Sequence, residues 1–274
     1  MIENYKSNFS QDESEINSRG WAGIKYLNAY PLVRGLEEDF PHWRRYNGTP
    51  SECSSLLDRG KVDIALVPLV GAVLNNWPFL SDVGIACHGP VESVKLIFHT
   101  PLNKVETYKP DPASQTSNLM ARLLYNLEFG RDILPNPRSE DAEIVIGDRA
   151  FEADTPDQID LGKAWFDETG LPFVFGVWAA RSDEILREVG PALIARMQAN
   201  LRDRDLLIYG ASRLTGKLIN VKDYLYSKLH YQLGELDQLG INTFVDLAFK
   251  YGFLPTRKMR TISLEPIQTV EPQV

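Results

Sequence analysis

The sequence has few of the residues that carry metal, thiol or redox chemistry. Among its 274 residues are two cysteines and four histidines. The cysteines, Cys53 and Cys87, do not form a zinc-binding spacing with each other, and the histidines are scattered along the chain. We therefore expect no metal site, and we expect the two cysteines to be buried hydrophobic residues in a reducing compartment.

Motifs that bind nucleotides or activate a serine nucleophile are also missing. The sequence contains neither GxxxxGK[ST] nor GxGxxG, and it contains no GxSxG. We therefore expect no cofactor, and no conventional catalytic nucleophile is visible.

Long apolar runs and an excess of basic residues are lacking as well. The best apolar run begins at Ile64 and is broken by Pro68, and no basic segment leads into an apolar core at the N-terminus. The net charge of −8 argues against nucleic acid or an anionic membrane as a partner. It leaves room for a small anionic ligand bound by N–H groups. We expect a cytoplasmic protein.

What the sequence does have is an alternation of predicted strands and helices. An apolar run at residues 171–181, rich in β-branched and aromatic residues, predicts a strand buried on both faces. Gly170 closes a predicted helix before this strand, and Ser182 opens one after it. Strands alternate with helices in both halves of the chain, which predicts an α/β fold with mostly parallel sheets.

We expect two lobes joined by two crossing strands, with a ligand cleft between them. Residues 1–20 are polar and acidic and are expected to be a disordered extension. The first lobe combines residues 21–92 with residues 178–274, and the second lobe spans residues 93–177. The C-terminal segment after residue 182 is expected to be helical, with Pro191 separating two helices and a tail from residue 256.

Uncharged polar residues follow several predicted strands or open predicted helices. Asn28 stands between a strand and a helix, where ligands bind in open α/β sheets, although it could simply cap the helix. Ser51 could cap the next helix, contact a ligand, or do both. Ser93 lies near the start of the first crossing strand. Trp178, in the predicted strand at residues 171–181, either forms a wall of the cleft or is purely structural.

The predicted second lobe adds two further groups. Hydroxyl and amide side chains gather before an amphipathic helix and suit a carboxylate, although an ordinary helix cap is the alternative: Ser114, Gln115, Thr116 and Ser117. Gly147 ends a buried strand and would let a ligand come close. Asp148 follows it and either caps a helix or orients a neighbour in the cleft. A polar, uncharged cleft of this kind suits a small carboxylated molecule, so the residues alone favour a binding protein over an enzyme.

Six motifs occur together in the order typical of one family. They are YLNAYPLVRGL (26–36), PSECSSLLDRGKVDIALVP (50–68), GPVESVKLI (89–97), DPASQTSNLMARLL (111–124), IGDRAF (146–151) and DLGKAWFDETGLPFVFGVWAAR (160–181). The chain thereby resembles the chorismate dehydratases of the futalosine route to menaquinone. The resemblance covers residues 24–181, and the C-terminal third matches only in its helical character.

The resemblance implies a two-lobed fold like that of type 2 periplasmic binding proteins. It also implies that chorismate loses water to give 3-[(1-carboxyvinyl)oxy]benzoate, without a metal or nucleotide. Within the family pattern Asn28 is catalytic, Ser93 is functionally important, and Thr116 and Ser117 contact a carboxylate. Gln115 stands where the family commonly has arginine, which removes a positive charge near the cleft.

Two other functions stay open at this point. One is the related 1,4-dihydroxy-6-naphthoate synthase of the same pathway, which shares the fold. The other is a cytoplasmic binding or sensor module for a small carboxylate, without turnover.

Overall fold

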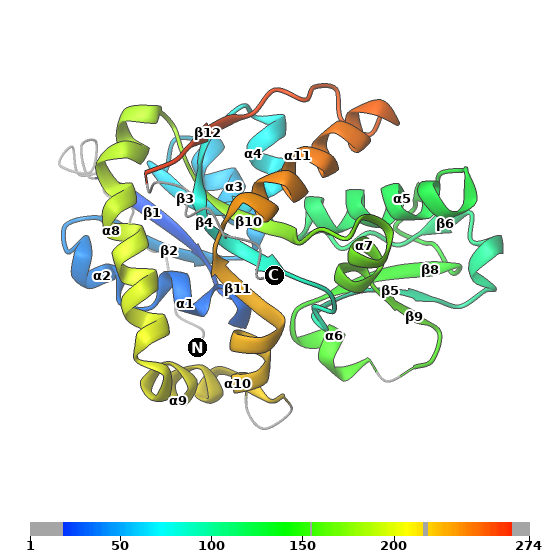
Figure 1. Ribbon diagram of the computed structural model, residues 1–274, viewed down its shortest axis with the longest axis horizontal. Helices are drawn as coiled ribbons and strands as arrows, with labels where there is room; N and C mark the ends of the chain where they lie inside the picture. The colour runs from blue at the N-terminus through cyan, green and yellow to red at the C-terminus, as the bar shows by residue number, and fades with distance from the viewer. Residues whose placement is uncertain (1–18, 154, 216–218, 265–274) are drawn as a thin grey trace, which may run out of the picture.

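The computed structural model describes residues 19–153, 155–215 and 219–264, and it holds two sheets of unequal size (Figure 1). The larger sheet has seven strands and the smaller has three, and a two-stranded ribbon accompanies the smaller one. The predicted N-terminal extension lies outside the described residues, except for its last two positions. The α/β class expected from the sequence is confirmed.

The large sheet has the strand order β11-β4-β10-β3-β1-β2, with β12 paired to β4. β1, β3 and β4 are buried along their whole length, which is why they are near-continuous apolar runs in the sequence. The strands are β1 (Gly20–Ile24), β2 (Arg44–Gly48), β3 (Ile64–Pro68), β4 (Pro78–Cys87), β10 (Phe173–Ala180), β11 (Leu229–Gln232) and β12 (Arg260–Ile262).

The expected strand directions require a correction. β1 runs parallel to β2 and β3, and β12 runs parallel to β4, but β10 is antiparallel to both β3 and β4, and β11 is antiparallel to β4. The large sheet is therefore mixed rather than mostly parallel. The reason is that the chain leaves this sheet along β4 and returns along β10, so these two neighbours run in opposite directions.

The small sheet has β5 at its centre, antiparallel to both β8 and β9. Its unit contains β5 (Val94–Phe98), β6 (Thr107–Tyr108), α5 (Gln115–Phe129), β7 (Leu134–Pro135), β8 (Ala142–Ile146), α6 (Asp148–Glu152), β9 (Gln158–Asp160) and α7 (Leu161–Thr169). The buried strand predicted to end at Gly147 is confirmed as β8, and the predicted helix ending at Gly170, where φ is +68°, is confirmed as α7. The proposed lobe boundary at residue 177 falls inside β10, whose pairing with β4 begins at Phe173.

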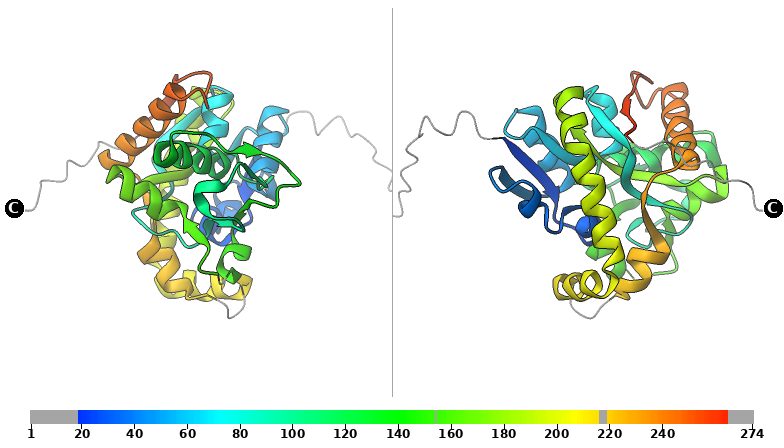
Figure 2. Two further views of the ribbon diagram at one scale, coloured as in Figure 1. Left: turned by 90° about the vertical axis from the view of Figure 1, so that its right-hand side faces the viewer. Right: turned by 60° about the vertical axis from the view of Figure 1, so that its left-hand side comes forward.

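The remaining helices belong to the large unit, and α8 lies along one face of its sheet (Figure 2). They are α1 (Tyr30–Val33), α2 (Leu36–Asp39), α3 (Pro50–Asp58), α4 (Leu69–Leu74), α8 (Asp183–Arg202), α9 (Arg204–Thr215), α10 (Val221–Asp223) and α11 (Glu235–Lys250). Thr49 caps α3 in a capping box with Glu52, so Ser51 is not the cap of this helix.

The C-terminal third differs most from the prediction. α8 is one continuous helix that contains Pro191, and the predicted break there is wrong. Residues 224–228 form a π-helical turn, and the next residues form β11 instead of helix. The expected tail contributes β12. Both strands are determined by pairing with the edge of β4 opposite β10, and local sequence patterns do not report such pairing.

Asp160, at the end of β9, ties the first crossing segment to the start of α7. Its carboxylate accepts hydrogen bonds from the backbone N–H groups of Val91 and Glu92 at 3.1 and 2.6 Å, and it caps α7 through Lys163 N–H at 2.9 Å. Glu92 has a φ of +63°, a conformation that costs free energy for a residue with a side chain. The hydrogen bonds from Val91 and Glu92 fix this turn, which leads directly into Ser93 and β5.

None of the helices in the described part of the chain has both the length and the apolar character needed to cross a bilayer.

Candidate active site

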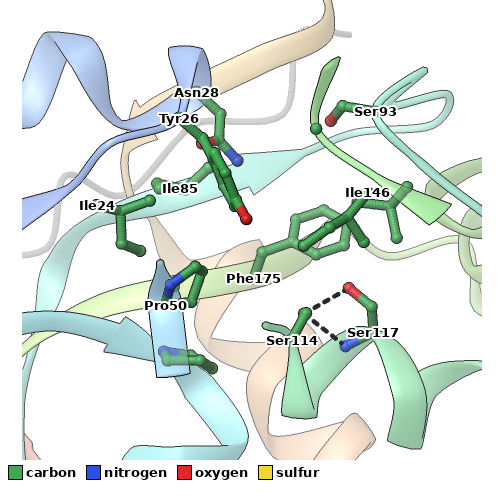
Figure 3. Close-up of a pocket in the computed structure, with 14 residues that line it drawn as sticks. Ile24, Tyr26, Asn28, Pro50, Ile85, Ser93, Ser114, Ser117, Ile146 and Phe175 are labelled. Carbon is green, nitrogen blue, oxygen red and sulfur yellow. Dashed lines mark hydrogen bonds between the residues drawn. The ribbon is translucent and has the colours of Figure 1, made fainter. Parts of the chain in front are cut away.

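A cavity of about 40 Å³ lies between the large sheet and the small one (Figure 3). Its apolar walls come from both sheets: Ile24 and Ile85 with Phe175 from the large one, and Val94 with Ile146 from the small one. The volume suffices for about three water molecules.

The lining contains half of the ten residues that the sequence singled out. Asn28, Ser93, Ser114 and Ser117 all line the cavity, together with the backbone at Gly147. In Figure 3, Asn28 and Tyr26 lie on one side, Ser114 and Ser117 lie on the opposite side, and Ser93 lies at a third corner. None of the lining residues carries an Asp, Glu, Lys, Arg or His side chain. Hydrogen-bonding groups without formal charge thus face one another across apolar walls.

Asn28 occupies a short 3-10 turn, Leu27–Ala29, directly after β1. Its side-chain oxygen, Oδ1, is buried and has no hydrogen-bond partner in the structure. A buried acceptor without a partner costs about 1–3 kcal/mol. Asn28 does not cap a helix here, since neither the 3-10 turn nor α1 has a side-chain cap. Asn28 thus lines the cavity and carries a buried acceptor whose hydrogen-bonding capacity is unused.

Ser93 is almost fully buried and connects the walls of the cavity. Its Oγ accepts a hydrogen bond from the Tyr224 hydroxyl at 2.7 Å, and its carbonyl oxygen accepts one from Gly147 N–H at 2.9 Å. Tyr224 is 131 positions away in the sequence. This contact brings the C-terminal segment to the cavity, which the sequence analysis did not expect.

Ser114 and Ser117 form the start of α5. Ser114 is the N-cap and its Oγ accepts from Ser117 N–H at 3.2 Å, while the two hydroxyl oxygens lie 2.7 Å apart. Both side chains are buried. Helix N-termini carry partial positive charge and free N–H groups, which favour a carboxylate. The predicted cap and the predicted cavity position therefore occur together.

The backbone conformation at position 147, beside the cavity, requires a glycine. Its φ of +62° and ψ of −139° are unfavourable for any residue with a Cβ atom. A Cβ atom at this position would also lie 3.9 Å from the ring of Tyr26. Tyr26, on the large-sheet side, thus lies over the backbone of the small unit.

Four predicted residues are not brought to the cavity. Ser51 Oγ lies 3.3 Å from Thr49 Oγ1, and Thr116 accepts a hydrogen bond from Val70 N–H at 3.1 Å. Gln115 is exposed, and Trp178 is fully buried in β10. These four residues lie outside the cavity lining, and for Trp178 the position matches the structural alternative left open by the sequence. The side chain of Asp148 lies outside the described part of the chain.

The structure gives a reason for two of these positions. Thr116 points from α5 to the first turn of α4, where its hydroxyl satisfies a free N–H group. Trp178 pairs with Leu66 at the centre of the large sheet, so it packs in the core. Within the described residues, no group of three or more His, Cys, Asp or Glu residues is arranged to hold a metal ion.

The family becomes clear from a comparison with known proteins. Residues 22–250 match the family described as "Menaquinone biosynthesis". The chain belongs to this family. It is 26% identical over 234 residues to the chorismate dehydratase of Campylobacter jejuni subsp. jejuni, covering 80% of this chain and 89% of that protein. It is 28% identical over 261 residues to the chorismate dehydratase of Thermus thermophilus, covering 81% and 92%.

Solved structures show the same fold at low sequence identity. A protein from Archaeoglobus fulgidus aligns with a TM-score of 0.68 and 12% identity over 89% of this chain and 100% of that one. The alkanesulfonate-binding protein of Xanthomonas axonopodis pv. citri aligns with a TM-score of 0.61 and 15% identity over 90% and 99%. The binding-protein-like fold expected for this menaquinone-biosynthesis family member is therefore confirmed.

Sequence reasoning missed three aromatic residues at the site. Tyr26 and Phe175 line the cavity, and Tyr224 bonds to Ser93. Tyr26 and Phe175 belong to the YLN and LPFVF motifs quoted above, so the motifs contained a signal that was not used. Tyr224 lies in a segment predicted as ordinary helix, and no local pattern marked it.

Proposed function

We propose that this protein is a chorismate dehydratase, a hydro-lyase that converts chorismate to 3-[(1-carboxyvinyl)oxy]benzoate. Family membership and the two dehydratase relatives support an enzymatic role. The observation that carries the proposal is that Asn28, whose buried Oδ1 has no partner, lines one cavity together with Ser93, Ser114 and Ser117. Loss of water from this substrate forms an aromatic ring.

The reaction removes the hydrogen at C3 and the hydroxyl at C4 as water. The formation of the aromatic ring drives the reaction and depends only on the substrate. The protein therefore mainly has to hold the substrate in one conformer and exclude water. The cavity lining offers no Glu, Asp or His side chain as a base. In our mechanism the substrate's own enolpyruvyl carboxylate takes the C3 proton and delivers it to the departing hydroxyl.

Asn28 has two groups for this step. Its buried Oδ1 accepts a hydrogen bond from the C4 hydroxyl, and its NH₂ group donates to the enolpyruvyl carboxylate. Both bonds fix the hydroxyl and the carboxylate next to each other. Ser93 donates to the other end of the substrate. The N-terminus of α5, with Ser114 and Ser117, binds the ring carboxylate.

The first test is an assay with the purified protein and chorismate. Formation of the benzoate product, followed by absorbance and mass spectrometry, supports the proposal. Tight binding of chorismate without product favours a sensor module. Absence of both favours the related naphthoate synthase, or another ligand.

The second test separates binding from chemistry at Asn28. Asn28→Asp keeps the shape of the side chain and replaces the NH₂ donor with a carboxylate oxygen. Chorismate binding is measured by calorimetry, and turnover is measured in the same preparation. Turnover at the wild-type level would remove Asn28 from the mechanism.

A further inference from the structure

Tyr224 lies at the first position of the π-helical turn Tyr224–Lys228, between α10 and β11. Its side chain is buried, and its ring meets the ring of Phe151 edge-on at a centroid distance of 4.9 Å. Phe151 belongs to α6, which directly follows the cavity backbone at Gly147. Single π-helical turns occur often at functional sites because they shift one side chain out of the regular helical position.

The hydroxyl of Tyr224 defines the hydrogen-bonding role of Ser93. A serine hydroxyl has one proton and two acceptor lone pairs. Tyr224 donates to Ser93 Oγ at 2.7 Å, and this bond occupies one lone pair. Ser93 is 1% exposed, so bulk water does not compete for the group. The proton of Ser93 is then left to donate into the cavity that the residue lines.

We propose that Tyr224 is a positioning residue for the dehydration reaction, acting through Ser93 and not by contact with the substrate. The inference rests on the function proposed above. The Tyr224 hydroxyl fixes the rotamer of Ser93 and makes its Oγ a donor toward a substrate oxygen. Without that bond, Ser93 can rotate or accept instead of donating. The substrate still binds, but it is oriented less often for elimination.

The chain offers a matched control two positions away. Tyr226 belongs to the same π-helical turn, and its hydroxyl donates to the carbonyl oxygen of Leu201 at 3.2 Å, away from Ser93. Tyr224→Phe and Tyr226→Phe each delete one buried or half-buried hydroxyl and keep the ring. Thermal unfolding is measured for both, so that any loss of stability is known before rates are compared.

The experiment compares four proteins in the chorismate assay with the wild type. We expect Tyr224→Phe to lower kcat about tenfold with KM changed less than about threefold, because positioning affects the reactive orientation more than binding. We expect Tyr226→Phe to stay within about twofold of the wild type. Ser93→Ala is expected to lose at least as much as Tyr224→Phe. The double variant Ser93→Ala with Tyr224→Phe is expected to match Ser93→Ala alone, since Tyr224 then has nothing to position.

Each result decides one point. If the wild type is active and Tyr224→Phe keeps the wild-type kcat, the inference is wrong and the proposed function stands. Additive losses in the double variant, or an equal loss in Tyr226→Phe, also overturn it, because they indicate a general structural role. A wild type that forms no product from chorismate overturns the proposed function, and this inference with it.

Discussion

The polar groups on the two walls of the cavity differ in whether they have hydrogen-bond partners. On the large-sheet side, Asn28 presents a buried carbonyl oxygen without a partner. On the small-sheet side, Ser114 and Ser117 bond to each other and to the first turn of α5. An unpartnered group is prepared for a ligand at a cost in stability, whereas a paired group must exchange one partner for another. We infer from the difference that Asn28 on the large-sheet wall takes part in the chemistry, whereas the start of α5 on the small-sheet wall takes part in binding.

The largest effect is expected on the large-sheet wall. Asn28→Asp should lower kcat by about 100-fold or more, which is typical for loss of one preorganised hydrogen bond in a catalytic site. Because the variant fills the same space, chorismate binding should weaken much less. Steady-state kinetics and calorimetry on one preparation separate the two effects. If binding is lost as strongly as turnover, the contrast between the walls does not hold.

Gly147→Ala tests the contact between the walls. The change adds a Cβ atom where φ is +62° and where the ring of Tyr26 lies 3.9 Å away. We expect a loss of about 1–3 kcal/mol in the free energy of unfolding from backbone strain. We also expect about a tenfold loss in kcat/KM, because the added methyl group occupies cavity space and kcat/KM responds to lost transition-state contacts.

Gly170→Ala is the matched control for this variant. Gly170 has a similar φ of +68° at the end of α7, and a Cβ atom there would meet nothing within 4 Å. The control should lose stability but keep its activity. Equal losses of activity in the two variants would mean that strain alone, and not the cavity, explains the effect at Gly147.

Part of this site could be predicted because its signals are local. Asn28, Ser93 and the serines of α5 stand at strand ends and helix starts, where residue type and position already indicate a role. The strand at 142–146 was predictable for the same reason. A short buried apolar run between turn residues is typical of a buried strand, and the structure forms a strand there.

The missed features depend on contacts that are far apart in the sequence. The bond between Tyr224 and Ser93 spans 131 positions, and no window of sequence contains both ends. Leu229 and Tyr231 alternate with polar residues, but they lie in a longer segment that was expected to be helical, and pairing with β4 makes residues 229–232 a strand. Thr116 was chosen for its hydroxyl, but only the packing of α5 against α4 shows that Val70 N–H uses it.

A smaller effect is expected on the small-sheet wall. Ser117→Ala removes one hydroxyl from the cavity but keeps Ser114 as the cap of α5. One neutral hydrogen bond contributes about 1 kcal/mol, so KM should rise about fivefold while kcat changes little. Ser51→Ala is the control, since Ser51 bonds to Thr49 outside the cavity and its loss should leave KM unchanged. A fall in kcat at Ser117 would make this wall part of the chemistry.

The smallest effect is expected at the capping box of α3, the helix that begins at the cavity-lining Pro50. Hydrogen bonds from Thr49 lower the pKa of the Glu52 carboxyl. A carboxyl whose pKa is lower in the folded state stabilises the protein above its unfolded pKa of about 4.3, and this contribution is lost as pH falls through the folded pKa. Glu52→Gln removes that dependence.

The difference in unfolding free energy between wild type and Glu52→Gln should therefore shrink as pH falls below about 4.3, when the wild-type carboxyl becomes protonated in both states. Denaturant unfolding at pH 7 and at successively lower pH measures it. Activity at pH 7 should be unchanged, because Glu52 is exposed and not among the lining residues. If Glu52→Gln lowers kcat instead, the start of α3 positions residues of the large-sheet wall for catalysis. The comparison of the two walls must then include α3.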